Sequence, residues 1–329
     1  MIIVRTPYRV SLFGGGTDFP AWYNQHGGKV LAFSINKYSY LSARLLPPFF
    51  SHSYRVSYSK IEEVVSLNQM EHPAFRHALQ LYGGSKSLEI HHHGDLPARS
   101  GIGSSSAFAV GIINALSSIN GNSLETAELA NLAINFEQNV LSENVGSQDQ
   151  ITCALGGVNS IVFKPNQNWE SEKLEITERY QKEISDRAVL FYSGITRTSS
   201  DISKSLLENI PKNAKNMLKL IELAEGGTKL FKIEGDLDEV GELLNESMRL
   251  KSAINPSSVN SNITELIQLA KKNGALGAKI LGAGGGGFFL FWLPIGVRSN
   301  FLSKMPPGVV VPFQIEQNGT QVIFNNSLE

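Results

Sequence analysis

A loop rich in glycine and serine, residues 95–107, leads into a long apolar segment and has the residue types that bind phosphate. Where such a loop opens a helix, the backbone N–H groups of the first turn lack intrahelical acceptors, and the helix dipole favours negative charge. Gly101 and Gly103 carry no Cβ, so an anion can approach the backbone closely. The serines at 104–106 can cap the helix or hold a metal ion bound to phosphate. By itself, this loop is equally compatible with an anion site and with an ordinary serine-capped helix after a tight turn.

A second glycine-rich loop at residues 281–287 has the spacing of a dinucleotide-binding motif, in Gly282, Gly284 and Gly287. That motif requires a following helix, whereas the aromatic run at 288–292 predicts a strand. The acidic residue that would bind the ribose, about twenty residues further on, is missing as well. We therefore exclude dinucleotide binding. Four consecutive glycines indicate a close backbone approach to a ligand or to another loop, with a plain glycine hairpin as the alternative.

Two carboxylates follow the first loop and could supply the chemistry that a phosphate site needs. The chain has no Gly-Lys-Ser/Thr sequence, so the first loop is not a Walker P-loop. A phosphate site without that lysine needs another counter-charge, usually Mg²⁺ on a carboxylate. Glu137 and Asp149 are the candidates, and the alternative for each is a solvated helix carboxylate.

The elements that must position these residues follow from hydrophobic periodicity and from glycine and proline punctuation. Strands are expected at residues 2–4, 8–13, 32–45 (with a kink at 36–37), 54–58, 88–93, 158–163, 188–192, 278–281, 288–292, 308–312 and 321–324. Helices are expected at residues 73–82, 107–119, 123–141, 147–154, 200–208, 213–225, 237–251 and 262–273. The polar segment 164–183, with one edge strand at 174–176, predicts a boundary between domains 1–183 and 184–329. Because no βαβ unit repeats, the pattern predicts an α+β protein.

Composition limits the function classes. The 329 residues carry a net charge of −1 and 18% charged residues, which excludes nucleic acid and membrane surfaces as partners. The N-terminal residues lack the pattern of a signal peptide, and the single Cys153 fits a reducing compartment, so the sequence predicts a cytoplasmic protein. Cys153 itself is expected to be a buried apolar residue. The histidines at 91–93 are not expected to share a metal ion, because adjacent strand residues point to opposite faces.

Three motifs in this order resemble those of the GHMP kinases, the group that includes galactokinase, homoserine kinase, mevalonate kinase and phosphomevalonate kinase. Residues 6–18 resemble the first motif, residues 97–105 the second and residues 281–287 the third. The resemblance implies an N-terminal domain like the second domain of ribosomal protein S5, a ferredoxin-like C-terminal domain, and an active site between them. We name residues 14–18 the acceptor loop, 97–105 the phosphate loop and 281–287 the third glycine loop.

The same resemblance implies roles for individual residues. Asp149 matches the catalytic aspartate and Arg9 the arginine that pairs with it. Glu137 and Ser105 match the Mg²⁺ site. Asp18 matches the aspartate that binds sugar hydroxyls, and the neighbouring Thr17 is also expected to contact the substrate. The resemblance implies that ATP contacts the two glycine-containing motifs at Pro97, Arg99, Ser100, Gly101, Ile102, Gly103, Ser104, Ser105, Ser106, Gly284 and Gly285.

The acceptor loop departs from the galactokinase pattern. Galactokinases have an acidic residue and a histidine at the positions of Gly15 and Gly16, and both side chains touch the sugar. The version in this chain resembles the D-glycero-D-manno-heptose 7-phosphate kinases, which make the 1,7-bisphosphate for nucleotide-activated heptose. A phosphorylated acceptor needs an added cation, which Arg197 or Lys37 could supply. An ordinary surface charge is the alternative for either residue.

Two other function classes remain open at this stage. The first is a kinase of the same family for fucose, galactose or another sugar. The second is a non-catalytic sugar sensor on the same fold, which the presence of Arg9, Glu137 and Asp149 disfavours, since a binding module needs no base. The sequence weakly indicates residues 54–63 for purine contacts and makes no prediction about the oligomeric state.

Overall fold

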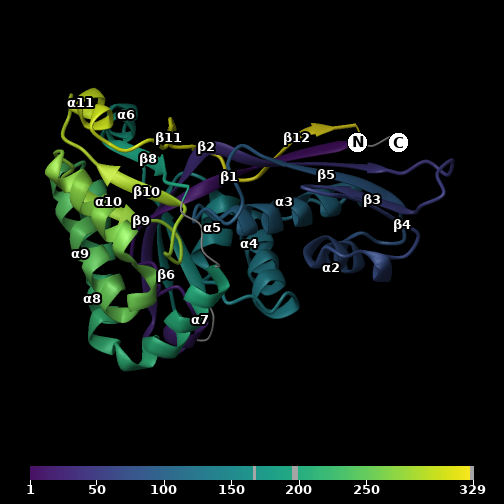
Figure 1. The fold of residues 1–329 in the computed structure, drawn as a ribbon. Helices are drawn as coiled ribbons and strands as arrows, with labels where there is room; N and C mark the ends of the chain where they lie inside the picture. The colour runs from purple at the N-terminus through teal and green to yellow at the C-terminus, as the bar shows by residue number, and fades with distance from the viewer. Residues whose placement is uncertain (166–167, 195–198, 327–329) are drawn as a thin grey trace.

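The computed structural model describes residues 1–165, 168–194 and 199–326. These residues form an eight-stranded and a four-stranded β-sheet, with helices packed against both (Figure 1). Strands and helices are mixed without a repeating βαβ unit, so the predicted α+β class is confirmed. Within the described ranges, no helix is long and apolar enough to cross a membrane.

The large sheet is built around β1 (Ile2–Phe13) and β2 (Gly28–Leu45), which pair antiparallel over most of their length. Its strand order is β12-β1-β2-β5-β3-β4, and β6 and β7 extend it from β2. The added strands are β3 (Tyr54–Ser57), β4 (Ile61–Val64), β5 (Leu88–Gly94), β6 (Val158–Phe163), β7 (Trp169–Lys173) and β12 (Gln321–Asn325). The last strand of the chain therefore lies beside the first, as Figure 1 shows near the two termini.

β1 runs through Pro7 without a break, so the prediction of separate strands on either side of this proline is wrong. Pro7 pairs with Tyr38 and Tyr8 pairs with Ile35, so residues 36–37 of β2 bulge out at this point. A bulge interrupts the ladder where proline has no N–H to donate, which allows the strand to continue. The kink predicted at residues 36–37 is confirmed as this bulge.

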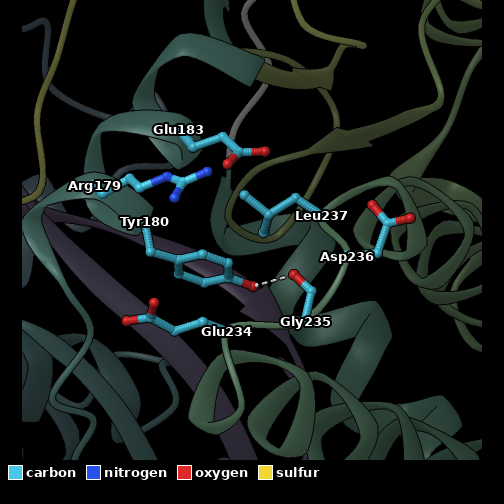
Figure 2. Close-up of a pocket in the computed structure, with 7 residues that line it drawn as sticks. All are labelled: Arg179, Tyr180, Glu183, Glu234, Gly235, Asp236 and Leu237. Carbon is cyan, nitrogen blue, oxygen red and sulfur yellow. Dashed lines mark hydrogen bonds between the residues drawn. The ribbon is translucent and has the colours of Figure 1, made fainter.

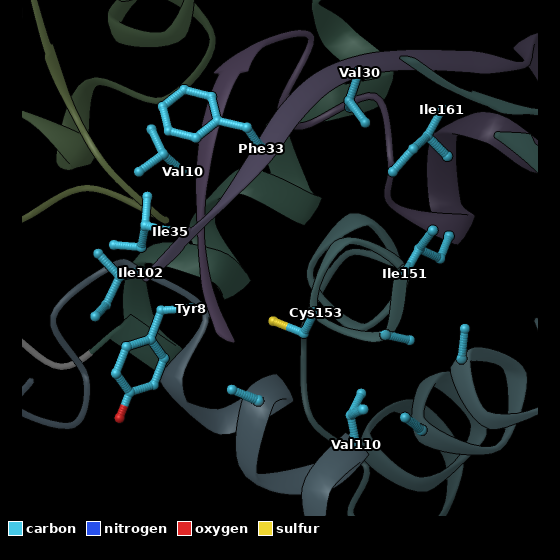
Figure 3. Packing of buried hydrophobic residues seen from close by; sticks show 14 of the residues in the cluster. Tyr8, Val10, Val30, Phe33, Ile35, Ile102, Val110, Ile151, Cys153 and Ile161 are labelled. Carbon is cyan, nitrogen blue, oxygen red and sulfur yellow. The ribbon is translucent and has the colours of Figure 1, made fainter. Parts of the chain in front are cut away.

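Both faces of the β1–β2 pair are covered near the end of β1. Residues 6–13 are all buried, although alternate side chains point to opposite faces. α3 (Ser104–Ile119) and α5 (Gln148–Leu155) pack on these strands, and so does α8 (Ala214–Lys232) from the second half of the chain. Figure 3 shows Cys153 of α5 among the buried side chains, which confirms its predicted burial.

The small sheet has the antiparallel order β11-β8-β10-β9. Its strands are β8 (Ala188–Tyr192), β9 (Gly277–Ile280), β10 (Phe288–Trp292) and β11 (Val309–Val311). α9 (Asp238–Ile254) and α10 (Ser261–Lys272) pack on β9, and α8 packs on α9. β10 is fully buried, because aromatic side chains occupy both of its faces.

The remaining elements are short or polar, and the sequence pattern missed several of them. The helices are α1 (Pro20–His26), α2 (Pro73–Tyr82), α4 (Thr126–Asn135), α6 (Glu178–Arg187), α7 (Ser199–Asn209), α11 (Arg298–Ser303), a π-helical turn (Phe136–Val140) and 3₁₀ turns at Leu67–Gln69, Ile210–Lys212 and Pro256–Ser258. The segment 164–183 contains β7 and most of α6, so it does hold the expected edge strand, which lies at Trp169–Lys173 instead of 174–176. The division into domains 1–183 and 184–329 stays a prediction. β12 lies in the second of these predicted domains but joins the large sheet by pairing with β1.

Candidate active site

Arg9 and Asp149 form a two-point ion pair at the centre of the predicted site. Arg9 lies on β1 and is 4% exposed, and Asp149 lies in the first turn of α5. Arg9 Nε donates to Asp149 Oδ1 at 2.6 Å, and Arg9 Nη2 donates to Asp149 Oδ2 at 2.5 Å. Burial opposes the charge on Arg9, but Asp149 outweighs it, so the pKa of Arg9 lies above its usual value. The pair holds one carboxylate in a fixed orientation, with part of that side chain open to solvent.

The phosphate loop lies directly against this pair. Arg9 Nη1 donates to the carbonyl of Gly101 at 2.7 Å, and the N–H of Arg9 donates to the carbonyl of Ile102 at 3.1 Å. Gly103 is the N-cap of α3 and has a φ of 73°, and no side chain caps the helix. The ordinary serine-capped helix is therefore wrong for this loop. The N–H groups of the first turn, at residues 104–106, remain available for an anion.

Other members of the phosphate loop shape its backbone. Ser100 Oγ donates to the carbonyl of Pro97 at 2.6 Å, and Ser104 Oγ accepts from the N–H of Arg99 at 3.2 Å. Arg99 has a φ of 57°, an uncommon value for a residue other than glycine. Such strain in a loop that faces a predicted ligand is consistent with a functional constraint.

The third glycine loop packs backbone to backbone on the phosphate loop. A Cβ at Gly101 would lie 2.6 Å from the carbonyl oxygen of Leu281, and a Cβ at Gly287 would lie 2.4 Å from that of Ser100. The N–H of Phe288 donates to the carbonyl of Ser100 at 3.0 Å. Glycine is required on both sides, since any side chain would separate the loops. The structure thus explains the glycine cluster by close approach to another loop, one of the two alternatives that the sequence left open.

Gly284 and Gly285, predicted as ATP contacts, lie beside Ser258. A Cβ at Gly284 would be 2.7 Å from Ser258 Cβ, and the N–H of Gly285 donates to the carbonyl of Ser258 at 2.8 Å. Their predicted contact with ATP stays a prediction.

Glu137 is a fully buried carboxylate in the π-helical turn, next to the start of α3. Ser105 Oγ donates to Glu137 Oε1 at 2.5 Å, and Gln150 Nε2 donates to Glu137 Oε2 at 2.5 Å. Burial raises the pKa of Glu137 to about 7, and the negative charge of Glu143 acts in the same direction. A carboxylate and a hydroxyl oxygen are hard ligands of the kind that Mg²⁺ prefers, so these two residues fit the predicted metal site.

Replacing Glu137 with Gln should make the free energy of unfolding less dependent on pH. The free side chain titrates near pH 4.5, whereas burial keeps it protonated in the folded protein up to about pH 7. The folded state therefore binds more protons in this window, and stability falls as pH rises, by at most about 1.4 kcal/mol per pH unit. Denaturant unfolding without added divalent cations, at several pH values across this window, measures the slope for wild type and Glu137→Gln. The exposed Glu222→Gln is the control, and an unchanged slope in Glu137→Gln would contradict the assignment.

Asp18 of the acceptor loop is 1% exposed and is held by several donors. The N–H of Gly16 donates to Asp18 Oδ1 at 2.8 Å, and Gln148 Nε2 donates to Asp18 Oδ2 at 3.0 Å. Burial raises the pKa of Asp18, and the charge of Asp149 raises it further, so the two carboxylates lie close enough to interact. A Cβ at Gly146 would fall 1.9 Å from Asp18 Oδ2, which explains why that position is glycine.

The other residues predicted to bind the acceptor are Thr17, Lys37 and Arg197. Thr17 Oγ1 donates to the carbonyl of Gly14 at 2.8 Å and accepts from the N–H of Lys29 at 3.1 Å, so its hydroxyl shapes the loop. Its role as a substrate contact stays a prediction. Lys37 lies in the bulge of β2. Arg197 lies outside the described residues.

Three polar residues that sequence reasoning did not select lie at the site. Gln148 precedes Asp149 and binds Asp18, as described above. Lys251 of α9 interacts electrostatically with Asp18, Arg9 and Asp149. Lys279 of β9 is 1% exposed and donates to the carbonyls of Ser11 and Leu12, at 2.8 and 2.6 Å. No local signal marks the two lysines, because only tertiary packing brings α9 and β9 against the end of β1.

The histidines at 91–93 behave as predicted. The rings of His91 and His93 lie on one face, with centroids 6.5 Å apart, whereas His92 packs against Phe108 at 5.1 Å. Among the described residues there is no group of three or more His, Cys, Asp or Glu side chains that could hold a metal ion. The predicted alternation of these side chains between opposite faces of the strand is confirmed.

An aromatic cluster lies near the phosphate loop, and one of its members, Tyr58, belongs to the segment 54–63 that the sequence indicated for purine contacts. Tyr58 contacts His72 with ring centroids 4.6 Å apart, and His72 lies 6.2 Å from Phe108. Burial lowers the pKa of His72, and the charge of Arg99 also lowers it, which places this cluster near the phosphate loop. Flat aromatic surfaces of this kind can pack against a nucleobase.

A cavity of about 380 Å³ lies elsewhere, between α6 and the segment that joins α8 to α9 (Figure 2). Tyr180 crosses it and donates its hydroxyl to the carbonyl of Gly235 at 3.1 Å. Glu183 is paired with Arg187 at 3.0 Å. The lining residues are Arg179, Tyr180, Glu183, Glu234, Gly235, Asp236 and Leu237, and none of them belongs to the predicted site. This cavity is therefore not the candidate active site.

Comparisons with known proteins identify the family to which the chain is similar. A family model described as the GHMP kinases N terminal domain matches residues 69–157, and one described as GHMP kinases C terminal matches residues 217–298. A D-glycero-alpha-D-manno-heptose 7-phosphate kinase of Campylobacter jejuni is 27% identical over 333 residues, covering 97% of this chain and 98% of the relative.

Solved structures show the same fold. A crystal structure described as a D-glycero-D-manno-heptose 1-phosphate kinase from Bacteroides thetaiotaomicron has a TM-score of 0.80 and 22% identity, and covers 99% of this chain and 100% of that chain. Lactococcus lactis galactokinase complexed with galactose has a TM-score of 0.74 and 18% identity, and covers 98% of this chain and 95% of that chain. The two-domain fold implied by the sequence resemblance is confirmed.

The protein is thus a phosphotransferase that uses an alcohol group as acceptor. The chain belongs to the GHMP kinases, a family that uses ATP as phosphate donor.

Proposed function

We propose that this protein is a sugar kinase that uses ATP to phosphorylate the anomeric hydroxyl of D-glycero-D-manno-heptose 7-phosphate. The product would be the 1,7-bisphosphate, which serves the synthesis of nucleotide-activated heptose. The observation that carries the proposal is the Arg9–Asp149 pair, which lies against the phosphate loop and beside the buried Asp18 of the acceptor loop. The similarity to the Campylobacter jejuni relative over nearly the whole chain supports heptose as the acceptor.

In this reaction Asp149 accepts or orients the proton of the acceptor hydroxyl. The hydroxyl oxygen forms a bond to the γ-phosphorus, the bond from that phosphorus to the ADP oxygen breaks, and ADP leaves with the electron pair. Arg9 holds Asp149 in place and offers positive charge to the transferred group. An anomeric hydroxyl is more acidic than an ordinary alcohol, so Asp149 needs to be only a modest base. Positioning and electrostatics supply most of the acceleration.

We propose that ATP lies along the phosphate loop, with its phosphates at the N-terminus of α3. The free N–H groups of residues 104–106 and the left-handed Gly103 support this position. Glu137 and Ser105 would hold Mg²⁺, which when bound supplies positive charge to the phosphates. Tyr58 and His72 are the proposed neighbours of the purine.

The acceptor should be a manno-configured heptose 7-phosphate rather than galactose. Gly15 and Gly16 leave no side chains where galactokinases contact their sugar, while Asp18 remains to bind hydroxyls. A charge-assisted contact to the substrate phosphate contributes about 1.5–3 kcal/mol, so kcat/KM should be roughly ten- to a hundredfold higher for heptose 7-phosphate than for the free heptose. Steady-state kinetics with heptose 7-phosphate, heptose, mannose and galactose measure this preference.

Each other outcome of that experiment selects a different function. If galactose or a free hexose is the best substrate, the heptose assignment is wrong and a kinase for another sugar takes its place; fucose belongs in the same panel. If none of the sugars is turned over while one of them still raises the melting temperature, the non-catalytic sensor is favoured.

A further inference from the structure

Lys251 of α9 reaches the acceptor loop from the second half of the chain. A Cβ at Gly15 would lie 3.8 Å from Lys251 Nζ, so the ammonium group stands where a side chain at position 15 would point. Lys251 Nζ donates to the carbonyl of Gly282 at 3.2 Å, in the third glycine loop. Asp18 and Asp149 interact with it electrostatically but do not form an ion pair with it in the described part of the chain.

Two residues that adjoin position 15, Ser11 and Gln148, each have a buried polar atom without a partner within the described ranges. Ser11 Oγ and Gln148 Oε1 have no hydrogen-bond partner among the described residues, and both side chains are more than nine-tenths buried. Ser11 Oγ adjoins the same point as Lys251, because a Cβ at Gly15 would lie 3.1 Å from it; Gln148 Nε2, which donates to Asp18, would lie 3.3 Å from that Cβ. Buried polar atoms are nearly always hydrogen-bonded, so the unpaired hydroxyl of Ser11, which can donate to an anion, indicates a ligand beside this cation.

The neighbouring Lys279 shows what a structural lysine does in this fold. It donates to two carbonyl oxygens of β1, at 2.8 and 2.6 Å, and thereby ties β9 to β1. Lys251 has one longer contact to a single carbonyl and is partly exposed. Burial lowers the pKa of Lys251, while the charge of Asp18 opposes that effect. An ammonium group has three donors and one of those on Lys251 has a partner among the described residues, so the group can still donate to an incoming anion.

We propose that Lys251 binds the phosphate group that the acceptor sugar already carries and so determines the preference for a phosphorylated acceptor. This inference rests on the proposed function. The glycine at position 15 leaves the path from the acceptor loop to Lys251 Nζ open, whereas an acidic side chain there would meet the ammonium group. Arg9, and not Lys251, contacts the phosphate loop directly through Gly101, so the transferred phosphoryl has its own cation.

The test compares kcat/KM for D-glycero-D-manno-heptose 7-phosphate with that for the unphosphorylated heptose. In Lys251→Gln the ratio of the two values should fall by roughly ten- to a hundredfold, because one charge-assisted contact is lost. Lys251→Arg should keep most of the preference. Lys37→Gln and Arg197→Ala should leave the ratio unchanged, and loss of the preference in either of them alone would overturn the proposal.

A pair of variants at Gly15 tests the charge without removing the lysine. Gly15→Glu places a carboxylate beside Lys251 Nζ and should lower the same ratio, whereas the equally large but neutral Gly15→Gln should lower it much less. The backbone at position 15 can accept a residue other than glycine, because Gly15 does not have a positive φ. This pair keeps the proposal testable if Lys251→Gln does not fold.

The remaining outcomes are decisive as well. If Lys251→Gln lowers kcat/KM equally for both sugars, Lys251 serves the transferred phosphoryl or the third glycine loop, and the proposal is wrong. If wild type prefers heptose 7-phosphate and all Lys251 and Gly15 variants keep that preference, the proposal fails while the proposed function stands. If wild type turns over neither sugar, the proposed function itself fails and the inference falls with it.

Discussion

Asp149→Asn should lower kcat by roughly 10²-fold or more, the size expected when a general acid–base group is lost. Asparagine has nearly the same shape, but its amide cannot take a proton from the acceptor hydroxyl. It also turns an NH₂ group towards one of the two Arg9 donors, so one arm of the 2.5–2.6 Å pair is lost. ATP binding should survive, because we propose that the N–H groups of the phosphate loop hold its phosphates. Steady-state kinetics and a nucleotide titration measure the two effects separately.

Asp238→Asn is the matched control for this variant. Asp238 also pairs with a buried arginine, Arg187, but it lies at the start of α9 away from the predicted site. It should lower the melting temperature with little change in kcat, which shows that breaking an arginine–aspartate pair does not by itself stop turnover. Near wild-type kcat in Asp149→Asn would remove Asp149 from the mechanism.

Elements bounded by strong local signals could be predicted from the sequence. The limits of α2 agree with the prediction at both ends, since Pro73 favours the first helical position and Gly83 follows the last residue. β8 and β10 agree as well, because each is a short apolar and aromatic run. α6 was missed because its sequence is mostly polar. Its buried face includes Tyr180, which packs against the distant Phe231 with ring centroids 5.8 Å apart.

The site could be predicted only in part, and for a related reason. Glycine spacing indicated the phosphate loop, because close backbone approach requires glycine wherever it occurs. The partnership of Arg9 with Asp149 joins residues 140 positions apart, so no local pattern contains it, and only the family resemblance indicated it. For Lys251 there was neither a local sequence pattern nor a family resemblance to indicate a role. The sequence of α9 is that of an ordinary amphipathic helix. Lys251 lies at the acceptor loop because α9 packs against β1.

Gly103→Val should abolish measurable ATP binding in a protein that still folds. At its φ of 73° a β-branched residue is strained by about 1–3 kcal/mol. Its Cβ would also lie 3.0 Å from Arg9 Cγ and 3.5 Å from Asp149 Oδ2, so the loop or the ion pair must move. Both effects displace the N–H groups at the start of α3, and each 1.4 kcal/mol lost is tenfold in affinity, so the loss should reach roughly 100-fold or more. Calorimetric titration with ATP and magnesium measures it.

Gly121→Val separates the effect of backbone strain from the effect of the collision with Arg9 and Asp149. Gly121 has a similar φ of 79°, but a Cβ there would meet nothing within 4 Å. This variant has the same kind of backbone strain without the collision, so it should lose stability and keep its affinity for ATP. If Gly103→Val is folded by circular dichroism and binds ATP as tightly as Gly121→Val, the phosphates do not lie at the start of α3. The anion site would then have to be sought along another part of the phosphate loop.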